Sequence, residues 1–397
     1  MPTPPKTPNL RHLRAFLAIA ETGSLTRAAA RVHVSQPAVS QALAGFERQA
    51  GGPLFDRTGQ GVFLTERGRV LEARVRRALN RLDAALAAVS PRLPLTATTA
   101  RLMALIATAE AQNFTLAARR LGVAQPTVHR AIAQFEAEAG KRLFERTSHG
   151  VVPTRACREL AEAARLAFAE LAQADAELAE LDGGDGGAIV IGALPLSRSV
   201  VLPEALARFR AARPRHPVTV LDGRYGDLLT GLRRGEIDFI LGALRDPPPI
   251  GDIVQEALFA DRLAVLARPG HSLAGRSCVP LETLARQAWV VPRTGTPARA
   301  QFDELFTRAG LVPPESILEC GSILLMRELL GRSDMLGCIS ARQAEAEVAR
   351  GLLVPLDIGR DWPERPIGLT FRAEWVPTRA QSQLIGFIRK AADRARG

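Results

Sequence analysis

The stretch Ser35–Glu47, SQPAVSQALAGFE, has a counterpart in Ala124–Glu136, AQPTVHRAIAQFE. Each begins with a Gln-Pro pair after one small residue and ends in Phe-Glu, and the two lie 89 positions apart. At that offset Leu13–Thr65 aligns with Leu102–Thr154 without a gap, and roughly half of the paired positions are identical. We therefore interpret the chain as carrying one small domain of about 55 residues twice, each time followed by a further helix.

Each copy is expected to begin with three helices. In the first copy an apolar-periodic helix covers about residues 10–21 and stops at Gly23, a typical C-cap. Ser24 is a typical N-cap for the second helix, and Ser35 for the third. Pro37 fits the third helix because it falls in the first helical turn, where its missing N–H leaves no bond unmade.

The third helix has an apolar back and a short polar front. The inward-facing positions at helical spacing are Val39, Leu43, Phe46 and Ala50. Gln36, Ser40 and Ala44 lie on the opposite face, with Pro37 and Gln41 at its edge. Such a helix after a short turn is typical of a helix-turn-helix, and PLFDR and VFLT around TGQG predict a β-hairpin wing. A three-helix module that only packs would be the alternative.

The overall composition favours an anionic partner. The 397 residues carry a net charge of +11, and 47% of them are hydrophobic. The four cysteines form no Cys-x-x-Cys pair, so we interpret them as reduced structural thiols of a cytoplasmic protein. The start, MPTPPKTPNL, lacks the apolar core of a signal peptide, and no run approaches the ~18 apolar residues that span a membrane.

Catalytic signatures are missing from the sequence. It contains no Walker phosphate loop, no G-x-G-x-x-G, no H-E-x-x-H and no G-x-S-x-G, and its six histidines are scattered. We therefore expect neither an enzyme nor a cofactor or metal site.

The stretch AETGSLTRAAARVHVSQPAVSQALAGFERQAGGPLFDRTGQGVFLTERG, residues 20–68, resembles the N-terminal winged helix-turn-helix of LysR-type transcriptional regulators. This resemblance implies that Gln36, Pro37 and Ser40 reach the DNA major groove. It also implies that Thr26 and Arg27 touch the backbone and that the Arg57-Thr58 wing holds phosphates. The residue chemistry agrees, because Gln and Ser can read base edges and Arg grips phosphate. The expected DNA-binding residues of the first copy are Thr26, Arg27, Ser35, Gln36, Pro37, Ser40, Gln41, Arg57 and Thr58.

The second copy keeps part of this set and changes the rest. Ala124 replaces Ser35, which removes an N-cap worth about 1 kcal/mol. His129 replaces Ser40, and Arg130 replaces Gln41. The expected DNA-binding residues of this copy are Thr115, Gln125, Pro126, His129, Arg130, Arg146 and Thr147. Whether the copy reads sequence, only grips the DNA backbone or merely packs stays open at this point.

A long helix is expected after each wing. The first, from about Gly68, carries a seam near heptad spacing, and the second covers about residues 156–181. The net charge is +3 over residues 69–86 and −4 over residues 158–181. We expect the two unlike helices to pack against each other, so that one chain mimics the dimer that relatives build from two subunits. Pairing of each helix with its own copy in a homodimer is the alternative.

After DGGDGG, from Asp182, strands and helices alternate. AIVIGAL, LPEALARFRAARP, VTVLDG and DFILGAL predict a parallel α/β unit, and a second unit begins near WVVPR. PIGLTFRAEW is expected to return to the first unit. LPEALARFRAARP, LLTGLRRGEIDFILGAL and LAVLARPGHSLAG resemble the LysR-type effector domain. This resemblance implies two subdomains like those of periplasmic solute-binding proteins, with a small-molecule effector in the cleft.

The effector residues are expected in loops at the carboxyl ends of strands, where open α/β sheets bind ligands. Helix N-termini there favour anions, so an organic anion is the expected effector. These same Ser and Thr side chains could instead simply cap helices. The candidates are Ser197, Arg198, Arg293, Thr294, Thr296 and Ser322.

The sequence thus predicts a multidomain regulator. The expected fold is two all-α winged helix-turn-helix domains, each followed by a long linker helix, and then an α/β effector domain. The expected bounds are 8–90, 98–182 and 188–397, the last divided into 188–267 with 366–397 and 268–365. The expected partners are double-stranded DNA, a small-molecule effector, further copies of the chain and RNA polymerase, with no membrane. The rivals are an exported solute-binding receptor and a nucleoid-like protein that coats DNA without sequence choice.

Overall fold

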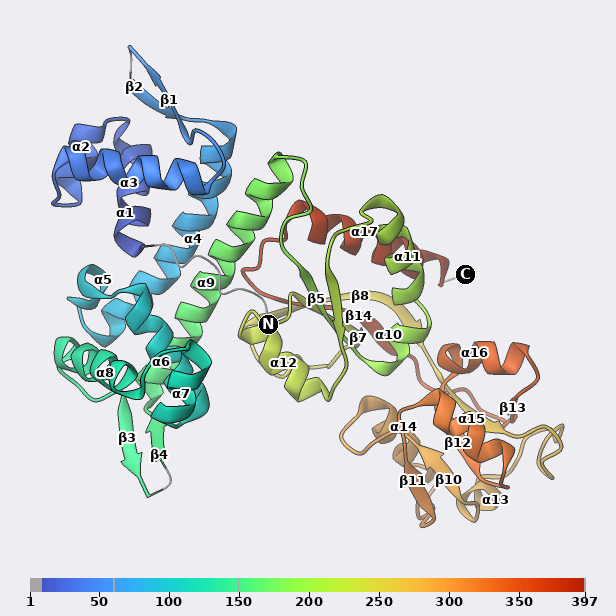
Figure 1. Cartoon of the computed structure of the whole chain (residues 1–397). Helices are drawn as coiled ribbons and strands as arrows, with labels where there is room; N and C mark the ends of the chain where they lie inside the picture. The colour runs from blue at the N-terminus through green and yellow to red at the C-terminus, as the bar shows by residue number, and fades with distance from the viewer. Residues whose placement is uncertain (1–8, 60, 149, 396–397) are drawn as a thin grey trace. The chain divides into compact units, whose positions relative to one another are not determined.

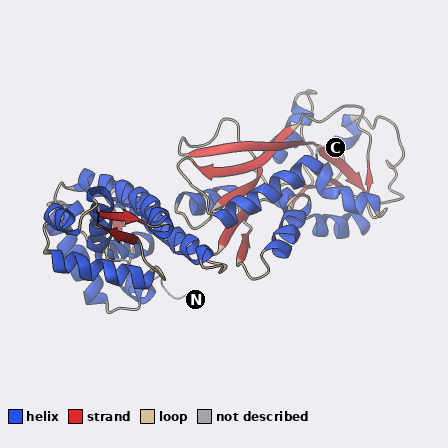
Figure 2. Cartoon of the chain, turned by 90° about the horizontal axis from the view of Figure 1, so that it is seen from above, coloured by secondary structure: helices blue, strands red, loops and turns tan. Residues whose placement is uncertain are grey.

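The computed structural model describes residues 9–59, 61–148 and 150–395 (Figure 1). Contacts between residues divide the chain into two compact units, of which the first holds residues 1–188 with Arg233–Glu236 and the second the remainder. Helices and two small hairpins build the first unit, and two five-stranded sheets with flanking helices build the second (Figure 2). In the described part of the chain, no helix has the length and apolar character needed to cross a membrane.

One order of elements occurs twice in the first unit: three helices, a hairpin and a long helix. Its first occurrence comprises α1 (Leu10–Thr22), α2 (Leu25–Arg31), α3 (Gln36–Gln49), β1 (Phe55–Thr58), β2 (Gly61–Leu64) and α4 (Glu66–Val89). Its second occurrence comprises α6 (Thr99–Ala111), α7 (Phe114–Leu121), α8 (Gln125–Ala139), β3 (Phe144–Thr147), β4 (Gly150–Pro153) and α9 (Arg155–Leu181). The short helix α5 (Leu93–Thr96) lies between them. Below, α1–β2 is called the first head and α6–β4 the second head.

The expected helix caps of the first head are present. Gly23 ends α1 in the left-handed conformation with φ 62°, and its N–H donates to the carbonyl of Ile19 over 2.8 Å. The side chain of Ser24 accepts a bond at the start of α2, and that of Ser35 does the same for α3. In the second head Ala124 starts α8 without a side-chain cap, as the sequence predicts.

The Phe-Glu pair that ends each quoted stretch has a structural role. Phe46 of α3 and Phe135 of α8 are buried on the inner faces of their helices. The carboxylate of Glu47 accepts a bond from the N–H of Leu54 over 3.0 Å, and Glu136 accepts one from Leu143 over 2.7 Å. Each glutamate therefore fixes the backbone that leads from the third helix into the hairpin, which explains why both copies share it.

The long helices α4 and α9 pack side by side and run in opposite directions (Figure 1). Arg67, near the start of α4, pairs with Asp182 just beyond the end of α9, whereas Arg77, farther along α4, pairs with Glu170. The buried seam between them is leucine-rich in α4 and rich in alanine and leucine in α9. The expected packing of two unlike helices within one chain is thereby observed.

The second unit contains two sheets. The strands of the first, in the order β6-β5-β7-β14-β8, are Val218–Leu221, Ile189–Ala193, Phe239–Ala243, Arg365–Arg372 and Ile253–Asp261. Those of the other, in the order β11-β10-β12-β9-β13, are Ile317–Glu319, Trp289–Val291, Leu336–Ser340, Leu263–Ala267 and Val354–Pro355. The pairings of β5 with β6 and β7 are parallel, and β14 returns to the first sheet as the sequence predicts.

Eight helices in the described part of the chain flank these strands. They are α10 (Pro195–Ser199), α11 (Leu202–Ala212), α12 (Tyr225–Arg233), α13 (Leu281–Ala285), α14 (Pro297–Thr307), α15 (Ile323–Gly331) and α16 (Ala341–Ala349) between strands, and α17 (Arg379–Arg394) at the end of the described chain completes the set around the two sheets. Helices α11 and α17 pack against each other beside the first sheet. The helices α10 and α14 follow strands β5 and β10, so their N-termini lie at the carboxyl ends of strands.

The crossover between the sheets differs from the predicted boundary at residue 267. β9, which was expected in the first subdomain, pairs with β12 in the second sheet, so the chain crosses at Arg262. The apolar sequence of β9 would fit the interior of either sheet. Only its pairing with β12 assigns it to the second sheet. The carboxylate of Asp261 accepts bonds from Arg365, which starts the returning strand, and from Ser340 over 2.7 Å. With 0% of the Asp261 side chain exposed, this cluster fastens the two crossing segments together.

The cysteines are free thiols, as expected. Cys157, Cys320 and Cys338 are buried, and Cys278 is exposed. Burial raises the pKa of Cys157 to about 12, so this thiol packs as a small apolar side chain beneath the second head.

Candidate functional site

The front of α3 is exposed while its back is buried. Gln36, Pro37 and Gln41 are exposed, and Ser40 is half-buried. Val39 and Leu43, on the other side of the helix, are 1% and 3% exposed. The residues expected to face DNA therefore lie together on the free face of this helix, next to the capping side chain of Ser35.

The front of α8 has the same placement with different side chains. Gln125, Pro126, His129 and Arg130 are all exposed. The ring of His129 meets the edge of Phe114 with 5.3 Å between ring centroids, which orients the imidazole. Within the described residues no carboxylate pairs with Arg130, so its guanidinium is available to a partner from outside.

Both hairpins place an arginine and a threonine at matching positions. Arg57 pairs across the first hairpin with Val62, and Arg146 across the second with Val151. Both arginines are exposed, and no acidic partner is found for either among the described residues. The hydroxyls of Thr58 and Thr147 donate to the carbonyls of Gly61 and Gly150, over 3.4 and 3.3 Å, and so stabilise the turns.

The second helices supply the remaining candidates. Thr26 in α2 and Thr115 in α7 are exposed in the first turn of their helices. The guanidinium of Arg27 donates to the carbonyl of Thr22 in the preceding helix. Arg27 therefore has a hydrogen-bond partner within the chain. The hydroxyl groups of Thr26 and Thr115 are exposed to solvent.

Ion pairs fix each head to its own long helix. Arg14 of α1 pairs with Asp83 of α4 over 2.5 Å, and Glu21 of α1 pairs with Arg76 over 2.7 Å. In the second head Arg165 of α9 pairs with Glu110 of α6 over 2.7 Å. These contacts, with the shared apolar core, hold each head against its own long helix.

The buried guanidinium of Arg74 joins α4 to α9. Its side chain is 1% exposed. Nε and Nη2 donate to the two carboxylate oxygens of Glu177 over 3.0 and 2.7 Å, and Nη1 donates to Gln173 over 2.7 Å and to Glu170 over 3.2 Å. Burial alone would lower the pKa of Arg74, but the hydrogen bonds and charges of Glu177 and Glu170 raise it above its usual value. A charged arginine that is almost fully buried therefore holds α4 and α9 together.

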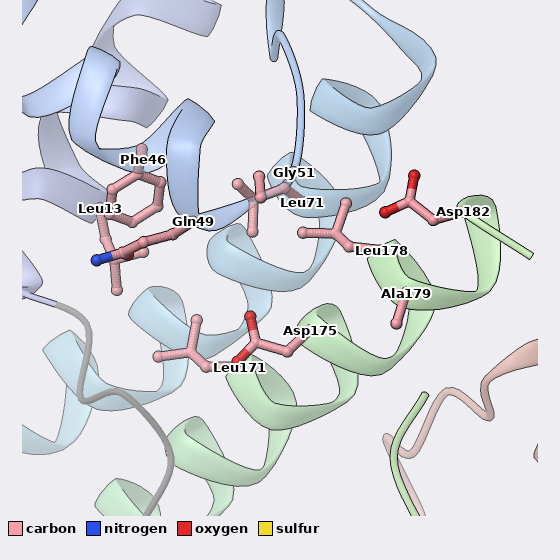
Figure 3. Close-up of a pocket in the computed structure, with 11 residues that line it drawn as sticks. Leu13, Phe46, Gln49, Gly51, Leu71, Leu171, Asp175, Leu178, Ala179 and Asp182 are labelled. Carbon is pink, nitrogen blue, oxygen red and sulfur yellow. The ribbon is translucent and has the colours of Figure 1, made fainter. Parts of the chain in front are cut away.

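A cavity of about 240 Å³ lies where the first head meets both long helices (Figure 3). Leucine side chains of α1, α4 and α9 line it, with Phe46 of α3 on one side. Asp175 of α9 also lines this cavity, where burial raises the pKa of its carboxyl group. The first head thus rests on the second long helix as well as on its own.

In the second unit, the candidate effector residues follow three strands. Ser197, after β5, is fully buried, and its hydroxyl donates to the carbonyl of Leu194 over 2.7 Å. Arg198 is exposed and pairs with Asp222, which follows β6, over 3.3 Å. The segment after β5 also lies close to the other subdomain, to which Gly321 belongs. A methyl group in place of the Gly321 side-chain hydrogen would lie 3.8 Å from the ring of Pro195.

The loops of the other subdomain hold the remaining candidates. Thr296 caps α14 by accepting from the N–H of Arg299 over 3.2 Å, and Ser322 caps α15 by accepting from Leu325 over 3.3 Å. Thr294 donates to the carboxylate of Glu319, and this bond lowers the pKa of that carboxyl group. Arg293 is exposed with no carboxylate partner among the described residues. The capping role that the sequence left open thus applies to Thr296 and Ser322.

Two residues at the same sheet edge were missed by sequence reasoning. Arg245 follows β7, and Tyr225 starts α12 after β6; the guanidinium lies 4.6 Å from the centre of the tyrosine ring. Burial lowers the pKa of Arg245 and raises that of Tyr225, and the buried hydroxyl of Tyr225 has no hydrogen-bond partner in the described part of the chain. The available signal was weak: Tyr225 is the only tyrosine, and Arg245 directly follows an apolar strand.

No group of three or more His, Cys, Asp or Glu side chains is arranged to hold a metal ion within residues 9–59, 61–148 and 150–395.

Comparisons with known proteins agree over nearly the whole chain. The family model described as the LysR substrate binding domain matches residues 182–393. The model described as the bacterial regulatory helix-turn-helix protein of the lysR family matches residues 10–69 and residues 99–158. The HTH-type transcriptional regulator GalR of Pseudomonas putida is 37% identical over 386 residues, which cover 96% of this chain and 97% of the relative.

Other relatives match a smaller share of this chain. The HTH-type transcriptional regulator PcaQ of Agrobacterium fabrum is 30% identical over 277 residues, which cover 70% of this chain and 89% of the relative. The solved structure of full-length LysG from Corynebacterium glutamicum, with bound effector Arg, has a TM-score of 0.53 at 19% identity. It covers 74% of this chain and 97% of that chain, and this likeness concerns the fold alone.

Proposed function

Because the chain belongs to the LysR family of transcriptional regulators, we propose that it binds DNA through two winged helix-turn-helix domains and that a small organic anion controls it. The observation that carries the proposal is the matched pair of exposed Gln-Pro faces on α3 and α8. Each face has a buried apolar back, a hairpin with an unpaired arginine and a long helix behind it. A module that only packs would have no reason to keep these polar faces free twice.

The comparisons support the proposal that the chain carries two winged helix-turn-helix domains. The helix-turn-helix model of the family matches both heads over ranges of equal length. GalR aligns over 97% of its own length while also covering 96% of this chain, so the additional segment has a counterpart there. PcaQ aligns over 89% of its length but covers only 70% of this chain. The share of this chain outside that alignment is longer than one head.

Each head offers base-reading and phosphate-binding groups. Gln36, Pro37, Ser40 and Gln41 of α3 face base edges, as Gln125, Pro126, His129 and Arg130 of α8 do. The hydroxyls and charges around them hold the DNA backbone: Thr26, Arg27, Ser35, Arg57 and Thr58 in the first head, and Thr115, Arg146 and Thr147 in the second. A basic net charge of +11 favours approach to DNA in general.

The effector binds between the two subdomains of the second unit. Arg293 supplies an unpaired cation, Ser197 and Ser322 lie at helix starts, and Arg198, Thr294 and Thr296 complete the set expected from the sequence. We add Arg245 and Tyr225, since a half-buried guanidinium without a carboxylate beside a buried, unpaired hydroxyl is suited to a carboxylate-bearing aromatic ligand. Binding across two subdomains favours one closed arrangement and thereby alters the DNA complex.

The regulator acts in the bacterial cytoplasm, where the chromosome lies, and works as an assembly of several chains together with RNA polymerase. The name of the relative GalR as a transcriptional regulator supports action on DNA.

A footprint with the full chain on the DNA upstream of its own gene tests DNA binding. We expect protection of a defined segment that persists when unrelated DNA is added in excess. Gln36→Ala and Gln125→Ala should each weaken one part of that footprint, at about 1–3 kcal/mol per lost bidentate contact. Uniform protection along the DNA would point to a coating protein and would contradict the proposal.

A thermal-shift screen of the full chain against aliphatic, aromatic and sugar acids tests the effector site. A matching anion should raise the melting temperature of the second unit and alter the footprint. Ser197→Ala, Arg293→Ala and Arg245→Ala should lose this response and keep the DNA affinity of the wild type. If all three variants respond like the wild type, the anion binds elsewhere.

A further inference from the structure

Resting on the proposed function, we infer that one chain reads an asymmetric DNA site made of two unlike half-sites. The geometry that carries this inference is the fixed pairing of α4 with α9, which holds two heads with different recognition faces in one body. Regulators that pair two identical heads read inverted repeats of one half-site, because the symmetry of the DNA site follows the symmetry of the protein.

The two recognition faces differ at two adjacent positions. Gln41 in α3 corresponds to Arg130 in α8, and Ser40 corresponds to His129. Glutamine forms its bidentate pair with adenine, whereas arginine forms it with guanine. The two half-sites therefore share the base contacted by the common Gln-Pro start and differ at the bases that Gln41 and Arg130 reach.

The two heads cannot change their spacing independently. Each is fixed to its own long helix by ion pairs, and Arg74 ties the helices together. Figure 1 shows the first hairpin at one end of the α4–α9 pair and the second hairpin at the other end. The heads are thus related by an approximate two-fold arrangement, and the half-sites should occur in inverted orientation at one fixed spacing.

Pairing of α4 with a second α4 would not reproduce this body. At the repeat offset, Arg81 and Ala88 of α4 correspond to Glu170 and Glu177 of α9. In an α4–α4 pair of the same geometry, Arg74 would therefore face Arg81 of the other copy and no carboxylate. A buried arginine left without its partners is strongly unfavourable.

Pairing of α9 with a second α9 fails for the opposite reason. Ala163 and Leu166 of α9 correspond to Arg74 and Arg77 of α4. Glu170 and Glu177, which are 13% and 19% exposed, would then have no cation opposite them. Because both like pairs leave buried charge uncompensated, the sequence selects the unlike pair and with it the asymmetric combination of heads.

The test is selection of binding sites from a pool of random duplex DNA with the full-length chain. The wild type should enrich one motif with two different half-sites at fixed spacing. Probes that carry the first half-site twice, or the second half-site twice, should bind about tenfold to a hundredfold more weakly than the selected motif.

Two variants exchange the recognition residues. Ser40→His with Gln41→Arg gives the first head the face of the second, and His129→Ser with Arg130→Gln does the reverse. Each double variant should enrich an inverted repeat of a single half-site, guanine-containing for the first and adenine-containing for the second. Arg155→Gln, a change of an exposed side chain at the start of α9, is the control and should enrich the wild-type motif.

The outcomes separate this inference from the proposed function. A palindromic wild-type motif, or a motif with one half-site only, would overturn the inference while leaving a sequence-specific regulator. Enrichment of no motif at all would overturn both. A melting curve of each double variant shows that it is folded, and the two variants together keep the test decisive if one of them is unstable.

Discussion

Replacing Arg74 by alanine is expected to lower the free energy of unfolding of the first unit more than the replacement of the neighbouring Arg77 does. The substitution leaves the carboxylate of Glu177 on α9 facing α4 without the guanidinium of Arg74, and it leaves Glu170 with Arg77 alone. Breaking a buried pair by removing one partner costs about 3–5 kcal/mol of the free energy of unfolding. The four hydrogen bonds of 2.7 to 3.2 Å that Arg74 makes place it in that class rather than among surface pairs.

The matched control is Arg77→Ala. Arg77 lies one turn farther along α4, is 34% exposed, and makes an ion pair of 3.1 Å with the same Glu170. A partly exposed pair of this kind is worth about 0–1 kcal/mol. A second test of the same contact is Arg74→Glu, which should be worse than alanine and should be partly rescued by Glu177→Arg, since the pair is then restored with reversed charges.

The chain carries its own probe for this measurement. Trp289, Trp362, Trp375 and Tyr225 all belong to the second unit, and residues 1–188 contain neither tryptophan nor tyrosine. In a urea titration of the full chain, far-ultraviolet circular dichroism follows the helices of both units, whereas tryptophan fluorescence follows the second unit. The unfolding of the first unit is then the transition that circular dichroism detects and fluorescence does not. With a slope of about 2 kcal/mol per molar urea, Arg74→Ala should lower the urea midpoint of this transition by about 2 M.

The fluorescence transition should stay where it is in both variants. If Arg74→Ala and Arg77→Ala shift the helical transition equally, by less than about 0.5 M, the buried arginine does not hold the two long helices together. A shift of the fluorescence transition as large as that of the helical one would also refute the reasoning, because the effect would then not be confined to the first unit.

Three further outcomes are expected. Arg146→Ala should lower the slope of log affinity against log salt by about one and weaken binding to all DNA sequences equally, as measured by fluorescence anisotropy. An unchanged slope would show that this side chain does not contact the DNA. Because burial raises the pKa of Asp175 in the folded state, folding favours its protonated carboxyl group, and ionisation destabilises the fold as the pH rises through that pKa. Asp175→Asn should therefore raise the urea midpoint at neutral pH and change it little in acid; a lower midpoint at neutral pH would contradict this. Alkylation of the native chain at about pH 8 should modify Cys278 alone, since the pKa of the buried Cys157 is about 12 and its thiolate is scarce; mass spectrometry that finds Cys157 labelled first would speak against its burial.

Local signals in the sequence were sufficient for the helices and hairpins of both heads. Gly23, Ser24 and Ser35 act through their own backbone and its nearest turn, so their capping roles follow from residue type and position alone. The alternation of strands and helices after residue 188 likewise fixed the α/β architecture, including the return of β14.

Features that depend on two distant segments were predicted only in outline. The opposite net charges of the two long helices indicated that they attract each other, but not that Arg74, one of five arginines between residues 69 and 86, would turn inward. That choice depends on the rotation of α4 against α9. The placement of β9 in the second sheet depended in the same way on its antiparallel partner β12, which lies more than seventy positions further along the chain.

The candidate effector site had the same limitation. The sequence placed Ser197, Arg293 and Ser322 at strand-to-helix turns; the structure has Arg293 and Ser322 in such turns and Ser197 within the short helix α10. The contact of Arg245 with Tyr225 could not be foreseen, because it joins the ends of two strands through side chains whose direction no local pattern sets.

The most direct measurement of the central claim is the number of half-sites that one chain occupies. Native mass spectrometry of the complex with a selected duplex gives the number of chains, and hydroxyl-radical footprinting of the same complex gives the number of protected half-sites. Since α3 and α8 belong to one chain and are held by α4 and α9, the account predicts two protected half-sites for every bound chain. One protected half-site per chain would contradict it.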